Sequence, residues 1–500
     1  MNKTNKRVNG NRSISLLALL VSVCLLVTAC AGNSSSPSPS GNGSSGGDPV
    51  ELTWYMPIGP QKDLAIVQEE ANQIIREKIN ATLRIMPIDF GSYEQKMNTM
   101  AAAGEAFDLV WTSHWAFNYV TNANKGAFYD ITELFEQYAP KTKELFTPQM
   151  IEDAKVNGVM YAVPNYQMFT TSGGFVIQER FIEKYNLDVD SLQDVRDIIP
   201  FVETIKANEP DIVPIGFENN SVFWMSTLYG LYDMNEIPYR KGDPNFEVLI
   251  LQETPEYAEY LKMAHEFNQK GYFPPSAATI QDFYTIQAKG NVALYLKNTL
   301  KPDGEINEKG KNNNNPVKFV DLVDQVYTNS LATMTAVSNT SRNPQKAVEL
   351  IELVNTDREL YRLLTAGIEG KHFERLEGDV IRPIPDSGYK FDSHFIGNVT
   401  NGYVLEGQPL DVWEQVREIN DNALVLPTVG FKFDQQPVLT ELANIAAVED
   451  EYALALNTGT LDPEQYLPVY IEKLRAAGSE RVREEKQRQL DEWLVEQGLK

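Results

Sequence analysis

The chain has 500 residues, with 69 acidic and 44 basic side chains and a net charge of −25 at neutral pH. This charge argues against a nucleic-acid partner and against binding an anionic bilayer through the protein's own surface, although it leaves a neutral ligand open. Only two cysteines occur, Cys24 and Cys30. A chain of this length is expected to fold as two lobes rather than one.

The first 29 residues have the pattern of an export signal. Residues 1–13 carry four basic side chains and no acid, and residues 14–29 form a short apolar run. That run falls short of the roughly 20 residues that a membrane-spanning helix needs. The junction Val-Thr-Ala-Cys, which ends at Cys30, resembles the bacterial lipobox, where the signal is cut before the cysteine and the thiol carries diacylglycerol. The alternative is a plain secretory signal with an incidental cysteine.

Residues 30–48 form the predicted lipid-bearing cysteine and its tether. Between Ala31 and Asp48 the chain is Ser, Gly, Asn and Pro, which cannot bury enough apolar surface to become ordered. Such a segment spans about 20–25 Å. Removal of the signal takes away four positive charges and Cys24, so the mature chain carries −29 and cannot form an intramolecular disulfide.

The body begins with alternating strands and helices. Short apolar runs predict strands at 50–56, 81–89 and 107–113, and helical spacing of apolar residues predicts helices at 63–80 and 92–104. This order indicates a parallel α/β sheet, in which ligands lie beyond the carboxyl ends of the strands. Those ends are Tyr55–Pro57, Asp89–Phe90 and Trp111–Trp115.

A second α/β region is predicted after residue 164. Strands are expected within 172–181, 212–224 and 290–298, a helix at 254–273, and a loop without a core at 301–316. From Pro437 onward the pattern is almost wholly helical. The expected helices there are 437–456, one starting at Asp462-Pro463, and 479–494.

Several motifs occur in a recognisable order: SYEQKMNTMAAAGEAFDLVW, GAFYDITELFEQYAP, NGVMYAVP, GFVIQERFIEKYNLD and GNVALYL. This ordered set resembles the extracellular solute-binding proteins of ABC importers, in the broad sugar-binding family. Residues 335–374 and 430–452 resemble its long lipoprotein subgroup from Gram-positive bacilli, which has an additional C-terminal domain of unknown function. The resemblance covers nearly all of the mature chain.

The resemblance implies a two-lobed α/β fold of the periplasmic-binding-protein type II class with a helical C-terminal region. The expected lobes are 48–165 with 333–390, and 170–328 with 391–500. The chain would cross between them near 164–171, 327–335 and 383–388. Closure would be a hinge motion, because a ligand that contacts both lobes favours the closed state.

The implied function is capture of a carbohydrate, specifically an oligosaccharide, and its delivery to the membrane subunits of an ABC permease. The protein would be a monomer without a cofactor, held by Cys30 at the outer face of the cytoplasmic membrane. Two alternatives remain open: a surface glycoside hydrolase, and a lipoprotein that binds peptides or lipids.

Sugar rings present apolar C–H faces and a rim of hydroxyls, so aromatic rings and polar side chains at strand ends are candidate ligand contacts. Trp111 is the first stacking candidate, with Ser113, His114 and Trp115 beside it. The remaining candidates are Tyr55, Tyr166, Gln167, Asn219, Phe223, Trp224 and Asn298. The competing interpretation is structural: tryptophans that anchor a helix, a packed hinge strand, and a solvated loop with its aromatics turned inward.

Catalytic and metal motifs are not evident. The four histidines lack metal-ligand spacing, and the H-E-x-x-H, G-x-S-x-G and phosphate-loop patterns do not occur. Glu369, His372 and Glu374 lie close in sequence, but a Gly-bounded turn explains them better than a catalytic group. We therefore expect neither a metal nor an enzyme.

Overall fold

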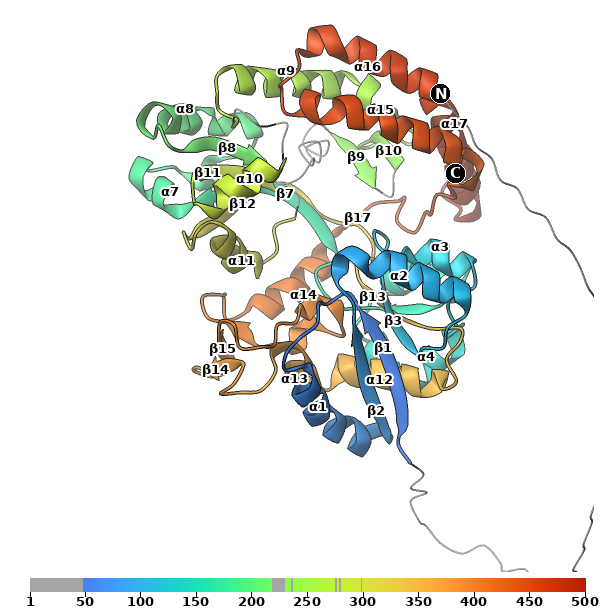
Figure 1. Ribbon diagram of the computed structural model, residues 1–500. Helices are drawn as coiled ribbons and strands as arrows, with labels where there is room; N and C mark the ends of the chain where they lie inside the picture. Colours follow the sequence, from blue (N-terminus) through green and yellow to red (C-terminus); the bar gives the residue numbers. More distant parts are fainter. Residues whose placement is uncertain (1–47, 218–229, 235–236, 275–276, 278–279, 298) are drawn as a thin grey trace, which may run out of the picture. The chain divides into compact units, whose positions relative to one another are not determined.

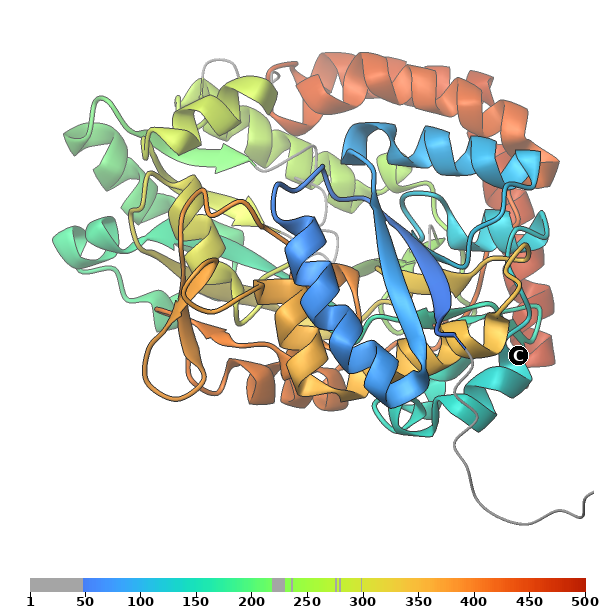
Figure 2. The ribbon, with the colours of Figure 1, turned by 60° about the horizontal axis from the view of Figure 1, so that its bottom comes forward.

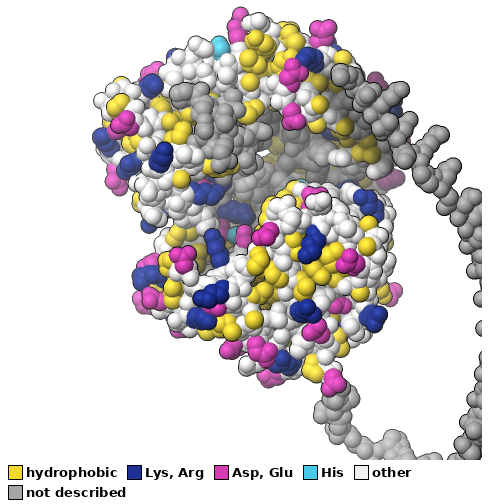
Figure 3. Space-filling view, viewed as in Figure 1, with side chains coloured by type: hydrophobic (Ala, Val, Ile, Leu, Met, Phe, Trp, Pro, Cys, Tyr) yellow, Lys and Arg dark blue, Asp and Glu magenta, His cyan; other side chains and the backbone are white. Residues whose placement is uncertain are grey.

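The computed structural model describes residues 48–500 except 218–229, 235–236, 275–276, 278–279 and 298. The signal, Cys30 and the tether lie outside the described residues, as do the candidates Asn219, Phe223, Trp224 and Asn298. Within the described part, every helix is too short or too polar to cross a membrane. Acidic and basic side chains are mixed over the face shown in Figure 3.

The first sheet has the strand order β2-β1-β3-β13-β6 (Figure 1). β1 (Val50–Met56) lies between β2 (Ala81–Pro87) and β3 (Leu109–Thr112) and is parallel to both, as the alternating pattern predicted. β13 (Met334–Val337) is antiparallel to β3 and to β6 (Ala162–Pro164). The carboxyl ends of β2, β1 and β3 therefore share one edge of this sheet.

Helices α1 (Leu64–Ile79) and α12 (Pro344–Thr356) pack against each other and against this sheet (Figure 2). Val67, Ala71 and Ile75 fall on one face of α1 and are fully buried, which confirms the helical spacing read from the sequence. On the far side of β2, α2 (Phe90–Ala103) ends at Gly104, whose left-handed conformation caps the helix. The smaller elements nearby are α3 (Tyr119–Asn124), α4 (Thr132–Tyr138), α5 (Pro140–Lys143), α6 (Pro148–Asp153), β4 (Lys155–Val156), β5 (Val159–Met160) and α13 (Arg358–Ala366).

The second sheet has the order β17-β12-β7-β11-β8. Its central strand β7 (Thr170–Gln178) is antiparallel to both neighbours, β12 (Val317–Tyr327) and β11 (Val292–Lys297). β8 (Val213–Phe217) and β17 (Leu424–Val425) form the edges. The other elements of this region are α7 (Glu179–Tyr185), α8 (Ile199–Asn208), β9 (Leu231–Met234), β10 (Ile237–Arg240), α9 (Pro255–Gln269) and α10 (Ile280–Ala288).

The C-terminal region is helical, as predicted. α15 (Leu439–Asn457) and α16 (Pro463–Ala477) pack on each other and on α9, and α17 (Ser479–Glu496) follows (Figure 1). The expected start at Asp462-Pro463 is confirmed: the Asp462 side chain accepts a hydrogen bond from the backbone of Glu464, and Pro463 opens the helix.

The chain passes between the sheets along residues 165–169 and 328–333, close to the expected crossings. It rejoins the second sheet at β17, later than the third crossing expected near 383–388, because Tyr389, Phe391 and Ile396 still pack in the first core. Four elements lie in the chain between α13 and β17: β14 (Phe373–Arg375), β15 (Val380–Pro383), β16 (Val404–Leu405) and α14 (Val412–Asn422). The lobe boundaries themselves stay a prediction.

The prediction of a loop without a core at 301–316 is wrong. Residues Gly304–Lys311 form helix α11, which packs on β12. Its one fully buried side chain is a carboxylate: Glu308 accepts a hydrogen bond from Tyr295 and faces Lys297 and Lys311. Because the buried side chain of this helix is charged, the segment shows no helical spacing of apolar residues, and the sequence pattern did not predict a helix there.

Candidate functional site

The loop after β3 crosses the carboxyl edge of the first sheet and is rigidly built. The Ser113 hydroxyl is fully buried and accepts hydrogen bonds from the backbone N–H groups of Trp115 and Ala116, at 3.2 and 2.8 Å. Thr112 donates to the carbonyl of Phe117 at 2.6 Å, and Phe117 adopts a positive φ of 43°. Ser113 therefore shapes the loop, and its hydroxyl has no exposed surface to offer a ligand.

The two tryptophans of this loop have different environments. Trp111 has no exposed surface, and its ring lies between Tyr93 and Phe395, with centroid distances of 5.7 and 5.3 Å. Trp115 is 49% exposed and rests edge-on against Trp111 at 5.4 Å. In this conformation Trp111 supports the site from beneath, and Trp115 is the ring that a ligand can reach.

Trp115 is held in one orientation by the second crossing segment. Its indole Nε1 donates to the carbonyl of Ala332 at 2.9 Å, and the backbone N–H of the neighbouring His114 donates to the carbonyl of Leu331 at 3.0 Å. The His114 side chain is exposed on the same loop. Fixing a ring in advance lowers the entropy that binding must overcome.

Phe90 is a second exposed ring at this edge, and sequence reasoning did not select it. It opens α2, directly after the end of β2, and it is 51% exposed. Its ring meets that of Trp115 with a centroid distance of 5.7 Å and an interplanar angle of 31°. Its position after a strand was visible in the sequence, but its exposure was not.

Tyr55 lies at the end of β1 and is half-buried, with its ring edge-on to Phe107 at 5.6 Å. It stands on the same edge of the sheet as the two exposed rings.

The candidates in the first crossing segment, Tyr166 and Gln167, are buried. The Tyr166 ring packs against Phe146 and Phe169, and burial raises the pKa of its hydroxyl. Both polar atoms of the Gln167 side chain are hydrogen-bonded: Nε2 donates to Thr333 at 2.7 Å, and Oε1 accepts from Lys301 at 3.0 Å. In this conformation both side chains are packed inside the protein along the first crossing segment, which agrees with the structural interpretation of these two residues.

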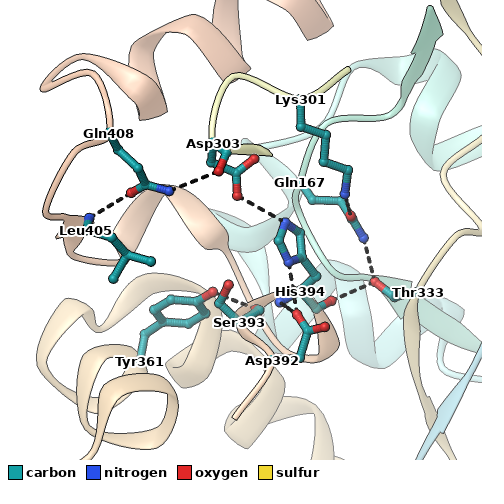
Figure 4. Close-up of polar contacts among 10 residues, drawn as sticks. All are labelled: Gln167, Lys301, Asp303, Thr333, Tyr361, Asp392, Ser393, His394, Leu405 and Gln408. Atoms are coloured by element: carbon teal, nitrogen blue, oxygen red, sulfur yellow. Dashed lines mark hydrogen bonds and ion pairs between the residues drawn. The ribbon is translucent and has the colours of Figure 1, made fainter. Parts of the chain in front are cut away.

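Around Gln167 lies a polar cluster that joins the two crossing segments to residues 301–303 and 392–394 (Figure 4). His394 stands between two carboxylates, with Nδ1 3.0 Å from Asp392 and Nε2 3.7 Å from Asp303. Its backbone carbonyl accepts a hydrogen bond from Thr333 at 2.8 Å. Gln408 donates to the Asp303 carbonyl at 3.3 Å, and Tyr361 donates to that of Ser393 at 2.7 Å.

Burial and charge set the protonation of this cluster. Partial burial opposes the charged form of Asp392, whose side chain is 53% exposed, but the hydrogen bond and charge of His394 outweigh it and lower the pKa of Asp392 to about 2. Burial also lowers the pKa of Lys301, which the carboxylates of Asp303 and Asp392 partly counteract. Among the described residues, no group of three His, Cys, Asp or Glu side chains is arranged to hold a metal ion.

Two α/β sheets joined by crossing strands, with aromatic rings at the carboxyl edge of one sheet, define a solute-binding protein. The family model described as bacterial extracellular solute-binding protein matches residues 71–367. A domain of unknown function, DUF3502, matches residues 427–495. The chain belongs to the bacterial extracellular solute-binding protein family, and the expected two-lobed fold with a helical C-terminal region is confirmed.

Within this family, the chain is similar to known proteins of one species. The chain is 30% identical to a carbohydrate ABC transporter substrate-binding protein of Streptococcus pneumoniae, over 99% of each chain. It is 27% identical to the N-glycan transport solute-binding protein NgtS of the same species, covering 89% of this chain and 99% of that one. The TM-score is 0.78 for NgtS alone, 0.69 for its complex with Man1GlcNAc and 0.66 for its complex with Man5GlcNAc. Along its whole length, the chain is thus similar to a substrate-binding protein of a carbohydrate ABC transporter.

Proposed function

We propose that this protein binds an oligosaccharide of the mannose and N-acetylglucosamine type on the aromatic edge of its first lobe and passes it, unaltered, to an ABC permease. The observation that carries this proposal is Trp115, a half-exposed residue fixed by Ala332 at the carboxyl ends of the parallel strands of the first sheet. Such a ring covers the apolar face of a sugar, and this edge is where open α/β sheets bind ligands.

The similarity to NgtS supports the choice of sugar, because that protein has been solved with Man1GlcNAc and with Man5GlcNAc. Hinge closure is part of the proposal. At the same identity and coverage, the TM-score falls from 0.78 to 0.69 and 0.66 between the NgtS structures, as expected if that protein changes conformation between them. The proposed lobes remain 48–165 with 333–390, and 170–328 with 391–500.

The binding test uses calorimetric titration of the protein without its signal and tether with Man1GlcNAc and Man5GlcNAc. Trp115→Ala should weaken binding of both glycans at least roughly tenfold, because the stacking ring is lost. Trp115→Phe should retain most of the affinity. Leu410→Ala, which shortens an apolar side chain that is 76% exposed, is the matched control and should bind as the parent does.

Failure of the parent protein to bind either glycan would contradict the sugar class. Unchanged binding in Trp115→Ala would contradict the site. Incubation of the protein with labelled glycans tests the glycoside hydrolase alternative, which shorter glycan products would favour. Binding of peptides or lipids in place of sugars would favour a lipoprotein that binds peptides or lipids.

We also propose that Cys30 carries the lipid anchor, and that the mature protein is a monomer tethered to the outer face of the cytoplasmic membrane. The order of signal, small residues, cysteine and polar tether supports this. Growth of a Gram-positive host with an alkyne fatty acid should label the parent protein. Cys30→Ala should lose the label and move into the medium, and a variant that stays labelled would refute the anchor.

A further inference from the structure

Phe90 and Trp115 stand apart from the other aromatic side chains of this protein. Among the Phe, Tyr and Trp residues whose burial the structure describes, these two alone are exposed by more than a third. They come from different elements, the start of α2 and the loop after β3, yet their rings touch. The exposed aromatic surface of the described chain is therefore gathered at one place.

Folding does not require this arrangement. The rings beneath it, Trp111, Tyr93 and Phe117, are buried and form edge-to-face contacts with one another. Trp115 rests edge-on against Trp111 of that cluster and Phe90 packs against Trp115, yet about half of each of these two residues stays exposed to water. A contiguous exposed apolar surface at a binding edge is typical of a ligand contact, whereas isolated exposed hydrophobic residues need no explanation.

The pair is also fixed in geometry. Trp115 is held by the Ala332 carbonyl and by the turn that Ser113 closes, and Phe90 is carried on the first turn of a 14-residue helix. The two ring planes are inclined by 31°, so the pair forms a shallow angle rather than one flat face. The mean plane of one pyranose chair cannot lie parallel to both ring planes.

We propose that Phe90 and Trp115 form two adjacent subsites, each covering one sugar residue, so that the preferred ligand is a chain of at least two residues that bends at the linkage between them. This inference rests on the proposed function and adds to it a second stacking residue, Phe90, and a preference for ligand shape. One sugar residue would lie on Phe90 and the next on Trp115, so the mean planes of the two sugar rings would be inclined to each other as the two aromatic rings are.

The experiment compares three ligands: methyl α-mannoside as a one-residue probe, and the disaccharide Man1GlcNAc and the longer Man5GlcNAc of the titration above. Phe90→Ala should weaken binding of both glycans roughly tenfold and leave the dissociation constant of the one-residue probe, measured by competition NMR in the millimolar range, unchanged. Trp115→Ala should weaken binding of all three. Phe90→Tyr should bind as the parent does, whereas Phe90→Leu, which is apolar but lacks a ring face, should resemble Phe90→Ala.

Three results would overturn the inference while leaving the proposed function intact: glycan binding by Phe90→Ala at parental strength, equal weakening of the one-residue probe, or full rescue by Phe90→Leu. A parent protein that binds no glycan would refute the proposed function and this inference together. Thermal unfolding of each variant controls for folding, and because Phe90 is half-exposed we expect its variants to melt with the parent.

Discussion

At the scale of single residues, the structure separates candidate side chains that are buried from candidate side chains that are exposed to solvent. Gln167 and Tyr166 carried the polar and aromatic character expected of ligand contacts, but both are buried in the crossing segment. The His394 imidazole, which showed no pattern in the sequence, lies between Asp392 of its own segment and Asp303 of a segment about 90 residues earlier in the chain. Residue type alone does not distinguish these cases, because burial depends on contacts with residues far away in sequence.

The Asp392–His394 pair predicts a response to acid. The pKa of Asp392 is lowered to about 2, below its ordinary value of 3.8, so its charged form stabilises the folded state above pH 3.8, and this contribution is lost as the pH falls toward 2. Asp392→Asn should therefore lower the free energy of unfolding at pH 5–7, by less than about 1 kcal/mol because the side chain is half exposed. The difference from the parent should vanish near pH 2.

Urea titrations at several pH values measure this difference. Asp211→Asn, at an exposed carboxylate, is the control. A deficit of Asp392→Asn that persists unchanged at pH 2 would contradict the assignment.

At the scale of elements, one glycine in β7 and one in α11 differ in the space that each has for a side chain. Gly174 lies in the central strand of the second sheet, and a Cβ placed there would lie 1.8 Å from the carbonyl oxygen of Val320 on β12. Gly310, in α11, has nothing within 4 Å of the corresponding position and is exposed. Both are glycines inside regular structure, yet only the first is required for packing.

The pair gives a matched test. Gly174→Ala should lower the free energy of unfolding by about 3 kcal/mol, because backbone atoms must move to admit the methyl group. Gly310→Ala should raise it by roughly 0.5–1 kcal/mol, because alanine favours a helix that already exists. Chemical denaturation measures both, and a destabilising Gly310→Ala would argue against helix α11.

At the scale of the whole molecule, two opposite charges lie where the start of the C-terminal region meets the second crossing segment: the buried carboxylate of Asp153 and the half-buried ammonium of Lys432. The Asp153 carboxylate accepts hydrogen bonds from Tyr327 and from the backbone of Ser330, at 3.2 and 2.8 Å. The Lys432 ammonium donates to the carbonyls of Asp153 and Lys155. Burial raises the pKa of Asp153 and lowers that of Lys432, and each charge partly offsets the effect on the other.

Removing the charge of Lys432 tests how far it stabilises the charged form of Asp153. Lys432→Met should lower the free energy of unfolding by roughly 3 kcal/mol at pH 7, because Asp153 loses the cation that faces it. The pKa of Asp153, already above its unfolded value, should rise further. A carboxyl group with a raised pKa in the folded state costs stability as the pH rises above its unfolded pKa of 3.8, so the variant should regain part of its deficit as the pH is lowered from 7 toward 3.8.

Two controls accompany this variant. Adding Asp153→Asn to Lys432→Met should abolish the recovery at low pH. Lys473→Met, which breaks an exposed pair with Glu451, should change stability by less than about 1 kcal/mol. A Lys432→Met protein with parental stability at pH 7 would show that the pair does not hold this junction.

The sequence by itself determined the elements whose pattern is local: the three parallel strands and two helices after residue 50, the second α/β region and the three C-terminal helices. Periodicity and caps such as Gly104 and Asp462 are properties of neighbouring residues, so they can be read without a fold. The order of motifs likewise determined the family.

Only the tertiary structure decided which side chains face solvent. It buried Trp111, Ser113, Tyr166 and Gln167, and it exposed Trp115 and brought Phe90 beside it. It also formed α11 around a buried carboxylate where the pattern indicated a loop. The physical reason is the same in each case: exposure and pairing are set by contacts between segments distant in the chain, which local spacing does not encode.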